Sequence, residues 1–216
     1  MIVTIDGPAG AGKSSVARAL ARKLGFRFLD TGAMYRAVAL AAVSRNLPWD
    51  DSQVAQLAAD ISIEVTDDRV FLDGEDVTGQ IRRSEITSVI HHVADNQQVR
   101  RHLVGLQRRI AAGSDIVTEG RDQGTVVFPH AECKIFLTAS EEERARRRFQ
   151  DLSARGEEVD FDEVLRKQHL RDQRDVERTF GGLAKAKDSI EVLTDGMTPE
   201  QVVDALEQLV RSAQNK

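Results

Sequence analysis

The chain has 216 residues, 41% of them hydrophobic, so it can bury a full core and is not expected to be disordered. Its formal net charge of −5 disfavours nucleic acid as the main partner, because nucleic-acid-binding surfaces are usually basic. The single cysteine, Cys133, excludes an intramolecular disulfide, and the longest wholly apolar run, 37–43, is too short to span a bilayer. Since the first apolar run also lacks a basic leader, we expect a cytoplasmic protein with small-molecule partners and no membrane attachment.

The first segment, Ile2–Asp6, is short and rich in β-branched residues, which is typical of a buried parallel strand. It leads directly into Gly7-Pro8-Ala9-Gly10-Ala11-Gly12-Lys13-Ser14, which matches the phosphate-binding pattern of a glycine, four residues and Gly-Lys-Ser. Apolar residues at helical spacing follow, until Gly25 provides a stop. Strand, glycine loop and helix in this order favour a phosphate site over a glycine turn that binds nothing.

This motif assigns a role to each of its polar positions. Backbone N–H groups of the loop would surround the phosphates of ATP, Lys13 would reach the outer phosphates, and Ser14 would ligate the Mg²⁺ that accompanies ATP. The predicted ATP-binding residues are Gly7, Pro8, Ala9, Gly10, Ala11, Gly12, Lys13, Ser14 and Ser15.

The rest of the chain alternates between predicted strands and helices. Further strands are expected over 26–30, 115–119, 134–138 and 189–193. Ser140 and Glu143 form a predicted capping box at the start of a charged helix, and Thr198-Pro199-Glu200-Gln201 opens the last helix with proline in its first turn. This alternation predicts an α/β fold, in which a five-stranded parallel sheet is flanked by helices.

One segment departs from the alternation. Short apolar runs over 61–65 and 69–72 are separated by Thr66-Asp67-Asp68 and followed by Asp73-Gly74-Glu75-Asp76, which are typical turn residues. We therefore expect a small antiparallel sheet near 60–85, within an insert and not as a separate domain.

Charged residues follow the predicted strand ends, where ligands gather in sheets of this type. Arg36 comes shortly after the second strand and can hold a phosphate through two hydrogen bonds, although a surface role is the alternative. Arg121 and Asp122 follow the third strand and offer a cation beside an acceptor, with a structural ion pair as the alternative. Arg171 and Arg178 share a helical face with Arg174, which is equally typical of a solvated surface. Phosphoryl transfer needs several cations, which favours a role for these arginines in binding phosphate over a purely structural or surface role.

Taken together, these segments resemble bacterial cytidylate kinases, a family of P-loop nucleoside monophosphate kinases. The matching stretches cover 5–14, 29–36, 72–78, 120–129 and 171–175. The resemblance implies transfer of the γ-phosphoryl group of ATP to CMP or dCMP with Mg²⁺. It also implies a monomer with one P-loop kinase domain over 1–216, an acceptor-binding insert over about 31–113 and a lid over about 150–182.

The resemblance further implies site residues. Lys13, Arg121 and Arg171 would be catalytic, and the acceptor site would contain Thr31, Arg36, His91, Arg100, Arg121, Asp122, Arg171, Asp175 and Arg178. A carboxylate such as Asp122 can accept from cytosine N4, while Arg100 can donate to the ring acceptors. No general base is expected, because a monophosphate acceptor is already ionised near neutral pH.

Two departures from the family pattern stand out. His91 occupies a position where relatives usually carry a serine that helps to read the base, and a histidine without any ligand is the alternative. Gly181-Gly182 replaces a more usual Ser/Ala-Pro, from which we expect a looser lid hinge.

Two other classes of protein remain as alternatives. A shikimate-type kinase would need a carboxylate such as Asp30 to activate a hydroxyl, whereas the Tyr35-Arg36 pair and the strand-rich insert favour a phosphorylated acceptor. A nucleotide switch would carry an Asn-Lys-x-Asp sequence, which this chain lacks.

Overall fold

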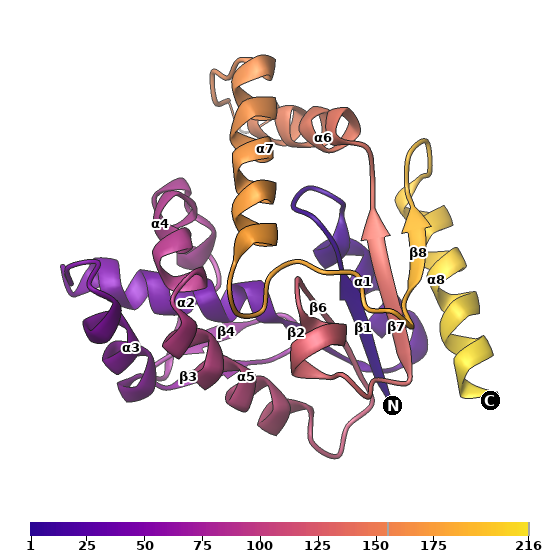
Figure 1. Ribbon diagram of the computed structural model, residues 1–216, viewed down its shortest axis with the longest axis horizontal. Helices are drawn as coiled ribbons and strands as arrows, with labels where there is room; N and C mark the ends of the chain where they lie inside the picture. Colours follow the sequence, from indigo (N-terminus) through magenta and orange to yellow (C-terminus); the bar gives the residue numbers. More distant parts are fainter. Residues whose placement is uncertain (155, 216) are drawn as a thin grey trace.

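The computed structural model describes residues 1–154 and 156–215, and its centre is a parallel sheet of five strands in the order β2-β6-β1-β7-β8 (Figure 1). The strands are β1 (Ile2–Asp6), β2 (Arg27–Asp30), β6 (Ile116–Gly120), β7 (Cys133–Thr138) and β8 (Ile190–Leu193). The predicted fold class is confirmed, and each predicted strand lies within a residue of its observed ends.

Helices cover both faces of the sheet, and each face has its own apolar core. Helices α1 (Lys13–Leu24) and α8 (Pro199–Gln214) lie together on one face, where Val3 and Ile5 of β1 share one buried core with Leu20 and Leu206. Helices α2 (Thr31–Ser44) and α5 (Gln97–Ala111) and the π-helical turn η2 (Gln123–Val127) belong to the other side. Since side chains alternate along a strand, Thr4 and Asp6 of β1 point away from the α1 and α8 face.

The two predicted helix starts are capped differently. At α8 both halves form, because the Thr198 hydroxyl accepts from the backbone N–H of Gln201 and the Gln201 side chain accepts from that of Thr198. At α6 (Glu141–Ala154) the Ser140 hydroxyl accepts from Glu143 N–H, but Asp195 takes the Ser140 N–H. The second half of that prediction is therefore wrong, and the reason is competition from a residue distant in the sequence.

A second, antiparallel sheet lies within the segment from 60 to 85, where it was expected. It contains β3 (Ile63–Val65), β4 (Val70–Leu72) and β5 (Glu75–Asp76), and it packs against α2. In the sequence, α3 (Asp51–Asp60) precedes it, and η1 (Gln80–Arg82) and α4 (Ser84–Ala94) follow it. Strand β5 was not predicted, because its residues were assigned to the turn. Asp67 ties this segment to the main sheet by accepting from the backbone N–H of Phe28 at 3.0 Å.

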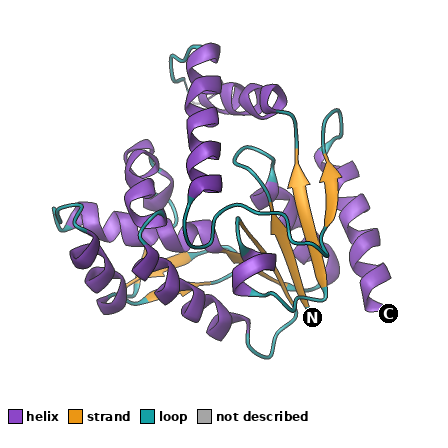
Figure 2. Ribbon diagram, viewed as in Figure 1, coloured by secondary structure: helices purple, strands orange, loops and turns teal. Residues whose placement is uncertain are grey.

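Helices α6 and α7 (Phe161–Glu177) stand beyond the carboxyl ends of the central strands (Figure 2). Phe149 and Phe161 pack edge to face across the pair, with ring centroids 6.0 Å apart. The predicted lid spans the end of α6 and all of α7, and residue 155 within it lies outside the described residues. None of the described helices is both long enough and apolar enough to cross a bilayer.

Leu206 tests the importance of the core beneath the phosphate loop. It is fully buried between α8 and the sheet, so Leu206→Ala leaves a cavity, and we expect the free energy of unfolding to fall by about 2–5 kcal/mol. Leu209→Ala, on the same helix at a partly exposed position, is the control and is expected to lose less than half of that. Equal losses in urea denaturation would contradict this account of the core.

Candidate functional site

The phosphate loop follows β1 without a break and packs tightly on its neighbour β7. Gly7 has φ 152°, and a Cβ there would lie 1.9 Å from the carbonyl oxygen of Leu137, so no other residue fits. Gly12 adopts the left-handed conformation at the N-cap of α1, which has no side-chain cap. The first N–H groups of α1 therefore stay available, and they point to the place where a phosphate would bind.

Lys13 is 95% shielded from solvent, and both arginines and carboxylates lie close enough to act on its charge. Its Nζ donates to the carbonyl oxygen of Pro8 at 2.7 Å, and it forms no ion pair within the described residues. Burial, together with the charges of Arg121 and Arg171, lowers the pKa of Lys13 to about 7, and Glu119 acts in the opposite direction. A bound anion would stabilise the charged form of this side chain.

Ser14 and Glu119 form the oxygen-rich part of the site. The Ser14 hydroxyl donates to Glu119 Oε1 at 2.8 Å, and the Thr31 hydroxyl donates to the Glu119 carbonyl oxygen at 2.6 Å. Hydroxyl and carboxylate oxygens are the ligands that Mg²⁺ prefers, and proteins usually bind it through one or two such groups together with substrate phosphates. This donor set fits Mg²⁺, and within the described residues no three His, Cys, Asp or Glu side chains are grouped to hold a metal.

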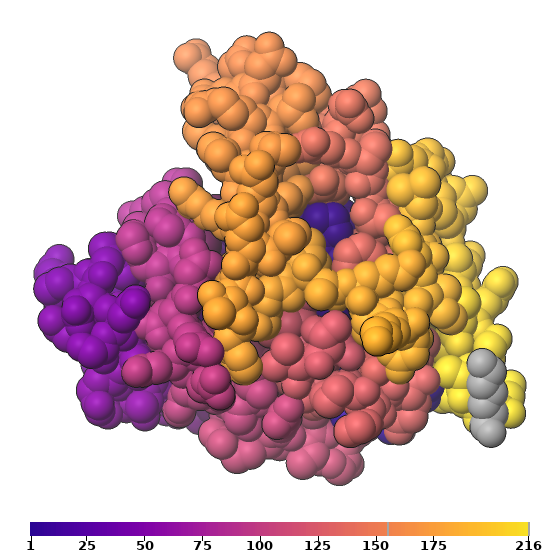
Figure 3. Space-filling model, viewed as in Figure 1, coloured from indigo at the N-terminus to yellow at the C-terminus, as the bar shows by residue number. Residues whose placement is uncertain are grey.

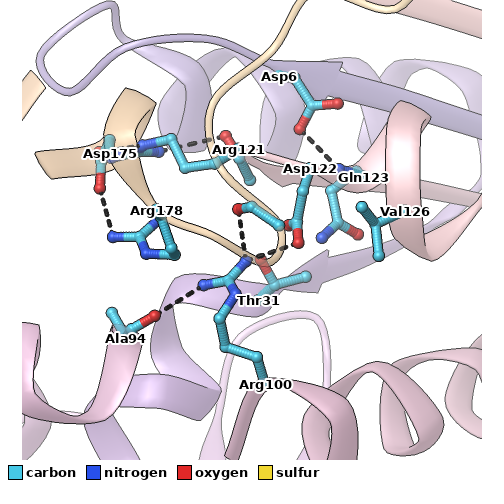
Figure 4. A network of polar contacts seen from close by, with 12 residues as sticks. Asp6, Thr31, Ala94, Arg100, Arg121, Asp122, Gln123, Val126, Asp175 and Arg178 are labelled. Atoms are coloured by element: carbon cyan, nitrogen blue, oxygen red, sulfur yellow. Dashed lines mark hydrogen bonds and ion pairs between the residues drawn. The ribbon is translucent and has the colours of Figure 1, made fainter. Parts of the chain in front are cut away.

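Asp175 of α7 holds two of the predicted acceptor residues. Its Oδ2 accepts from Arg121 Nε at 2.7 Å, and its Oδ1 accepts from Arg178 Nη2 at 2.8 Å (Figure 4). Burial alone would raise the pKa of Asp175, but Arg121 and Arg178 outweigh it and hold the pKa well below its usual range. The sequence leaves a structural ion pair between the adjacent Arg121 and Asp122 as an alternative. In the structure, Arg121 pairs with Asp175 instead.

The partner of Asp122 is Arg100 of α5. Arg100 Nη2 donates to Asp122 Oδ2 at 2.6 Å and to the Gly181 carbonyl oxygen at 2.9 Å, and Nη1 donates to the Ala94 carbonyl oxygen at 3.0 Å (Figure 4). Arg100 and Asp122 are each only 3% exposed, and within the described residues Arg100 Nε has no partner. Segments from distant parts of the chain therefore fix the plane of this guanidinium.

His91 lies three residues before Ala94 on α4, on the same side of the helix. Its ring is partly buried and lies 4.0 Å from the ring of His92, which stacks on Trp49 at 4.7 Å between centroids. The described contacts of His91 are thus with another ring and not with Arg100 or Asp122.

The glycines after α7 serve close packing. Gly181 has φ 67°, and a Cβ there would lie 2.1 Å from Asp122 Oδ2 and 2.5 Å from Arg100 Nη2. Glycine is therefore needed for the chain to pass over this pair. The looser lid hinge expected from Gly181-Gly182 stays a prediction.

Arg36 and Arg171 complete the set of cations. Arg36 Nη1 donates to Thr87 Oγ1 at 2.8 Å, while Arg171 makes no ion pair with any described residue. Desolvation and then the charge of Arg121 lower the pKa of Arg171 to about 10, so this exposed side chain stays charged at neutral pH. Arg36 and Arg148 also lower that pKa, which means that several guanidinium groups face one region with few carboxylates among them. Such a region attracts phosphate.

Sequence reasoning missed Arg144 of α6. Its Nη1 donates to the carbonyl oxygen of Ala9 in the phosphate loop at 3.0 Å and to Asp172 Oδ2 of α7 at 2.5 Å. This side chain joins the loop to both projecting helices. Figure 3 shows indigo atoms of the N-terminal segment at the bottom of a hollow beneath these helices. Nothing in the spacing of a charged helix distinguishes such an arginine from its solvated neighbours.

These features define the chain as a P-loop kinase. A glycine loop leads into a lysine and a helix N-terminus, and it faces guanidinium groups, among them Arg171, that form no ion pair with a described residue. The cytidylate kinase family model matches residues 3–212, and the chain belongs to that family. It is 51% identical to a cytidylate kinase from Rhodopirellula baltica over 212 residues, covering 98% of this chain and 93% of that protein. It is 47% identical over 215 residues to one from Carboxydothermus hydrogenoformans, covering 97% of each.

A comparison of structures supports the fold alone. Shikimate kinase from Bacteroides thetaiotaomicron superposes with a TM-score of 0.50 at 13% identity, covering 98% of each chain. A protein from Eubacterium ventriosum described as uncharacterized reaches 0.55 at 14% identity, again covering 98% of each.

Removal of the Asp175 charge should destabilise the protein. Asp175→Asn leaves Arg121 and Arg178 without their shared anion, and we expect the free energy of unfolding at pH 7 to fall by about 3–5 kcal/mol in urea denaturation. Because the native pKa is lowered, this contribution is complete above the unfolded value of about 3.9 and is lost as the pH falls further. The gap between wild type and variant should therefore stay constant from about pH 8 to 5 and shrink below about 4.

Glu177→Gln is the matched control for this experiment, because Glu177 is an exposed carboxylate on the same helix with no ion pair to a described residue. It should change stability by less than about 0.5 kcal/mol. A gap for Asp175→Asn that already narrows between pH 7 and 5 would contradict the lowered pKa.

Proposed function

We propose that this protein transfers the γ-phosphoryl group of ATP to CMP or dCMP, giving CDP or dCDP and ADP, with the residues described above in defined roles. The observation that carries the proposal is the meeting of the phosphate loop with guanidinium groups from α2, the β6 end and α7. Membership of the cytidylate kinase family supports the choice of acceptor.

On the ATP side, residues 7–15 surround the phosphates. Backbone N–H groups and the N-terminus of α1 bind the phosphate oxygens, and Lys13 stabilises the outer phosphates. Kinases of this kind generally use a divalent cation. We assign Mg²⁺ to Ser14, with Glu119 acting through water, and the ion would neutralise charge on the transferred group.

On the acceptor side, Arg36, Arg121 and Arg171 hold the phosphate of CMP, with Thr31 at the end of β2 beside them. Asp175 and Arg178 face the sugar, and Arg100, Asp122 and His91 face the base. Lys13, Arg121 and Arg171 act as catalytic residues because they would touch the oxygens on which negative charge develops. The support for these roles is the shared charge environment of Lys13, Arg121 and Arg171 and the ion pairs that orient Arg121.

No general base is needed, because the acceptor is a phosphate group and not a hydroxyl. The second pKa of a phosphate monoester is about 6, so the attacking oxygen is already anionic at neutral pH. Catalysis then depends on bringing two anions together, which Lys13 and the arginines make possible, and on excluding water while α6 and α7 close as a lid.

We extend the proposal to domain organisation and setting. The segment 31–113 acts as the acceptor-binding insert and 150–182 as the lid of a single kinase domain over 1–216. The protein would work as a monomer, as the family resemblance implies, and in the cytoplasm, where a chain with a single cysteine, Cys133, needs no disulfide.

The alternative of a shikimate-type kinase depends on Asp30 as the group that activates a hydroxyl. Asp30 Oδ1 accepts from the Ala33 N–H at 2.9 Å as the N-cap of α2, and Oδ2 accepts from Arg82 at 3.0 Å. Both carboxylate oxygens of Asp30 already accept structural hydrogen bonds, which disfavours a role in activating a substrate hydroxyl. The phosphorylated acceptor remains the better choice.

Arg171 tests the reaction and the role of the unpaired cation together. In an assay of ADP release with CMP, dCMP, UMP, AMP and shikimate as acceptors, wild type should respond most to CMP and dCMP. Arg171→Ala should lower kcat by about a thousandfold or more, as the loss of a transition-state cation does in related phosphoryl transfers, without a change in fold by circular dichroism. Arg174→Ala, three residues later on the same helix, is the control and should retain activity. Near-normal turnover by Arg171→Ala would refute this role.

Asp122 tests the reading of the base. Asp122→Asn replaces an acceptor for cytosine N4 by a group that can also donate to uracil O4, so the ratio of kcat/KM for CMP over UMP should fall by about tenfold to a hundredfold. The ratio of CMP to dCMP should stay unchanged, because the sugar is assigned to Asp175 and Arg178. An unchanged ratio of CMP to UMP in initial-rate measurements would remove Asp122 from base recognition.

A further inference from the structure

Asp6 is a buried carboxylate to which the mechanism above gives no role. It is the last residue of β1 and stands immediately before Gly7, the first residue of the phosphate loop, with 4% of its surface exposed. Its Oδ1 accepts from the backbone N–H of Gln123 at 2.8 Å, and its Oδ2 accepts from that of Gly124 at 2.7 Å. Figure 4 shows Asp6 aimed at the turn that follows Asp122.

These two N–H groups belong to the first turn of η2, which has no side-chain cap from its own N-cap residue, Asp122. The first N–H groups of a helical turn lack partners within it and attract an anion. Asp6 supplies that anion from β1, a neighbouring strand. The fit is close, since a Cβ on Gly124 would lie 2.9 Å from Thr4 Oγ1 and 3.4 Å from Asp6 Oδ2.

The turn that Asp6 holds carries the acceptor-binding residues. Arg121 and Asp122 directly precede Gln123, and they make the ion pairs to Asp175 and Arg100. The backbone position of this turn therefore determines where a cation and a carboxylate stand relative to the phosphate loop.

We propose that Asp6 is a positioning residue that joins the ATP loop to the acceptor-binding turn, so that loss of its paired oxygens weakens CMP binding and leaves ATP binding nearly intact. This proposal rests on the proposed function of Arg121 and Asp122. It assigns Asp6 no contact with either nucleotide. Its effect passes through the backbone N–H groups of Gln123 and Gly124.

The charge of Asp6 supplies a second readout. Burial raises the pKa of Asp6 to about 7, against the opposing effect of the two N–H groups, while Asp122 raises it and Lys13 lowers it. Protonation turns one carboxylate oxygen into a hydroxyl, which is a weaker acceptor, so at least one of the two bonds to the N–H groups is weakened. Acidification through neutral pH should therefore loosen the turn in wild type.

The decisive variant is Asp6→Asn, which keeps the size of the side chain but has a single oxygen. We expect the KM for CMP to rise about tenfold, the size expected for one lost hydrogen bond to a charged group, while the KM for ATP changes by less than about twofold. Thr4→Val is the matched control, because Thr4 lies on the same face of β1, is fully buried, and has an Oγ1 without a partner among the described residues. It should leave both KM values unchanged.

The pH profile separates positioning from a general loss of structure. As the pH falls from 8 to 6, the ratio of the KM for CMP of Asp6→Asn to that of wild type should decrease towards one, because wild type loses the same interaction by protonation. The titration of CMP itself cancels in this ratio. A ratio that does not change with pH would contradict the proposal.

Gly124→Ala displaces the same turn without changing a charge, and it serves if Asp6→Asn does not fold. It should also raise the KM for CMP selectively. Equal effects on the KM of both nucleotides, or a lower melting temperature with unchanged KM for CMP, would overturn the proposal. The wild-type assay with CMP tests the proposed function separately. A wild type that does not phosphorylate CMP would refute the proposed function. An active wild type whose KM for CMP is unchanged by Asp6→Asn would refute only this inference.

Discussion

The parallel pairing of β1 with β6 is the constraint on which the site depends. Its register sets Asp6 opposite Gly120, so that the two strands end at the same level. The phosphate loop leaves the first strand and the turn with Arg121 leaves the second, and both emerge on the same edge of the sheet. Two nucleotides can then meet with their phosphates together, because the groups that bind them start from adjacent backbone positions.

The second organising feature is an imbalance of charge. Lys13 and Arg171 have no carboxylate partner within the described residues, while Asp175 serves both Arg121 and Arg178. One buried anion thus keeps part of the cluster in place, and the remaining positive charge is left to the substrates. Unpaired cations cost stability in the empty protein, and bound phosphates relieve that cost. In the proposed function, the same imbalance favours acceptors that carry a phosphate.

The projecting helices are attached to the phosphate loop by Arg144, which reaches Ala9 on one side and Asp172 on the other. One side chain thus contacts both the loop and these two helices. Asp6 provides a similar link on the acceptor side. The carboxyl edge of the sheet behaves as a set of turns tied together by buried charged groups, each of which accepts from or donates to backbone atoms.

The sequence alone determined the features whose causes are local. The glycine loop, the strand before it and the capping of α8 by Thr198 follow from residues within a few positions of one another, and so does the alternation that predicts a parallel sheet. The resemblance to a known family supplied the expected acceptor residues, whose roles stay predictions, and among them is Arg100, which no spacing rule identifies.

Only the tertiary structure decided the contacts between distant segments. It paired Arg100 with Asp122 and Arg121 with Asp175, gave the Ser140 N–H to Asp195, and brought Asp6 to Gln123. A charged side chain has several possible partners of equal chemistry along the chain. Which of them it meets is fixed by the order and register of the strands, and these depend on the packing of the whole sheet.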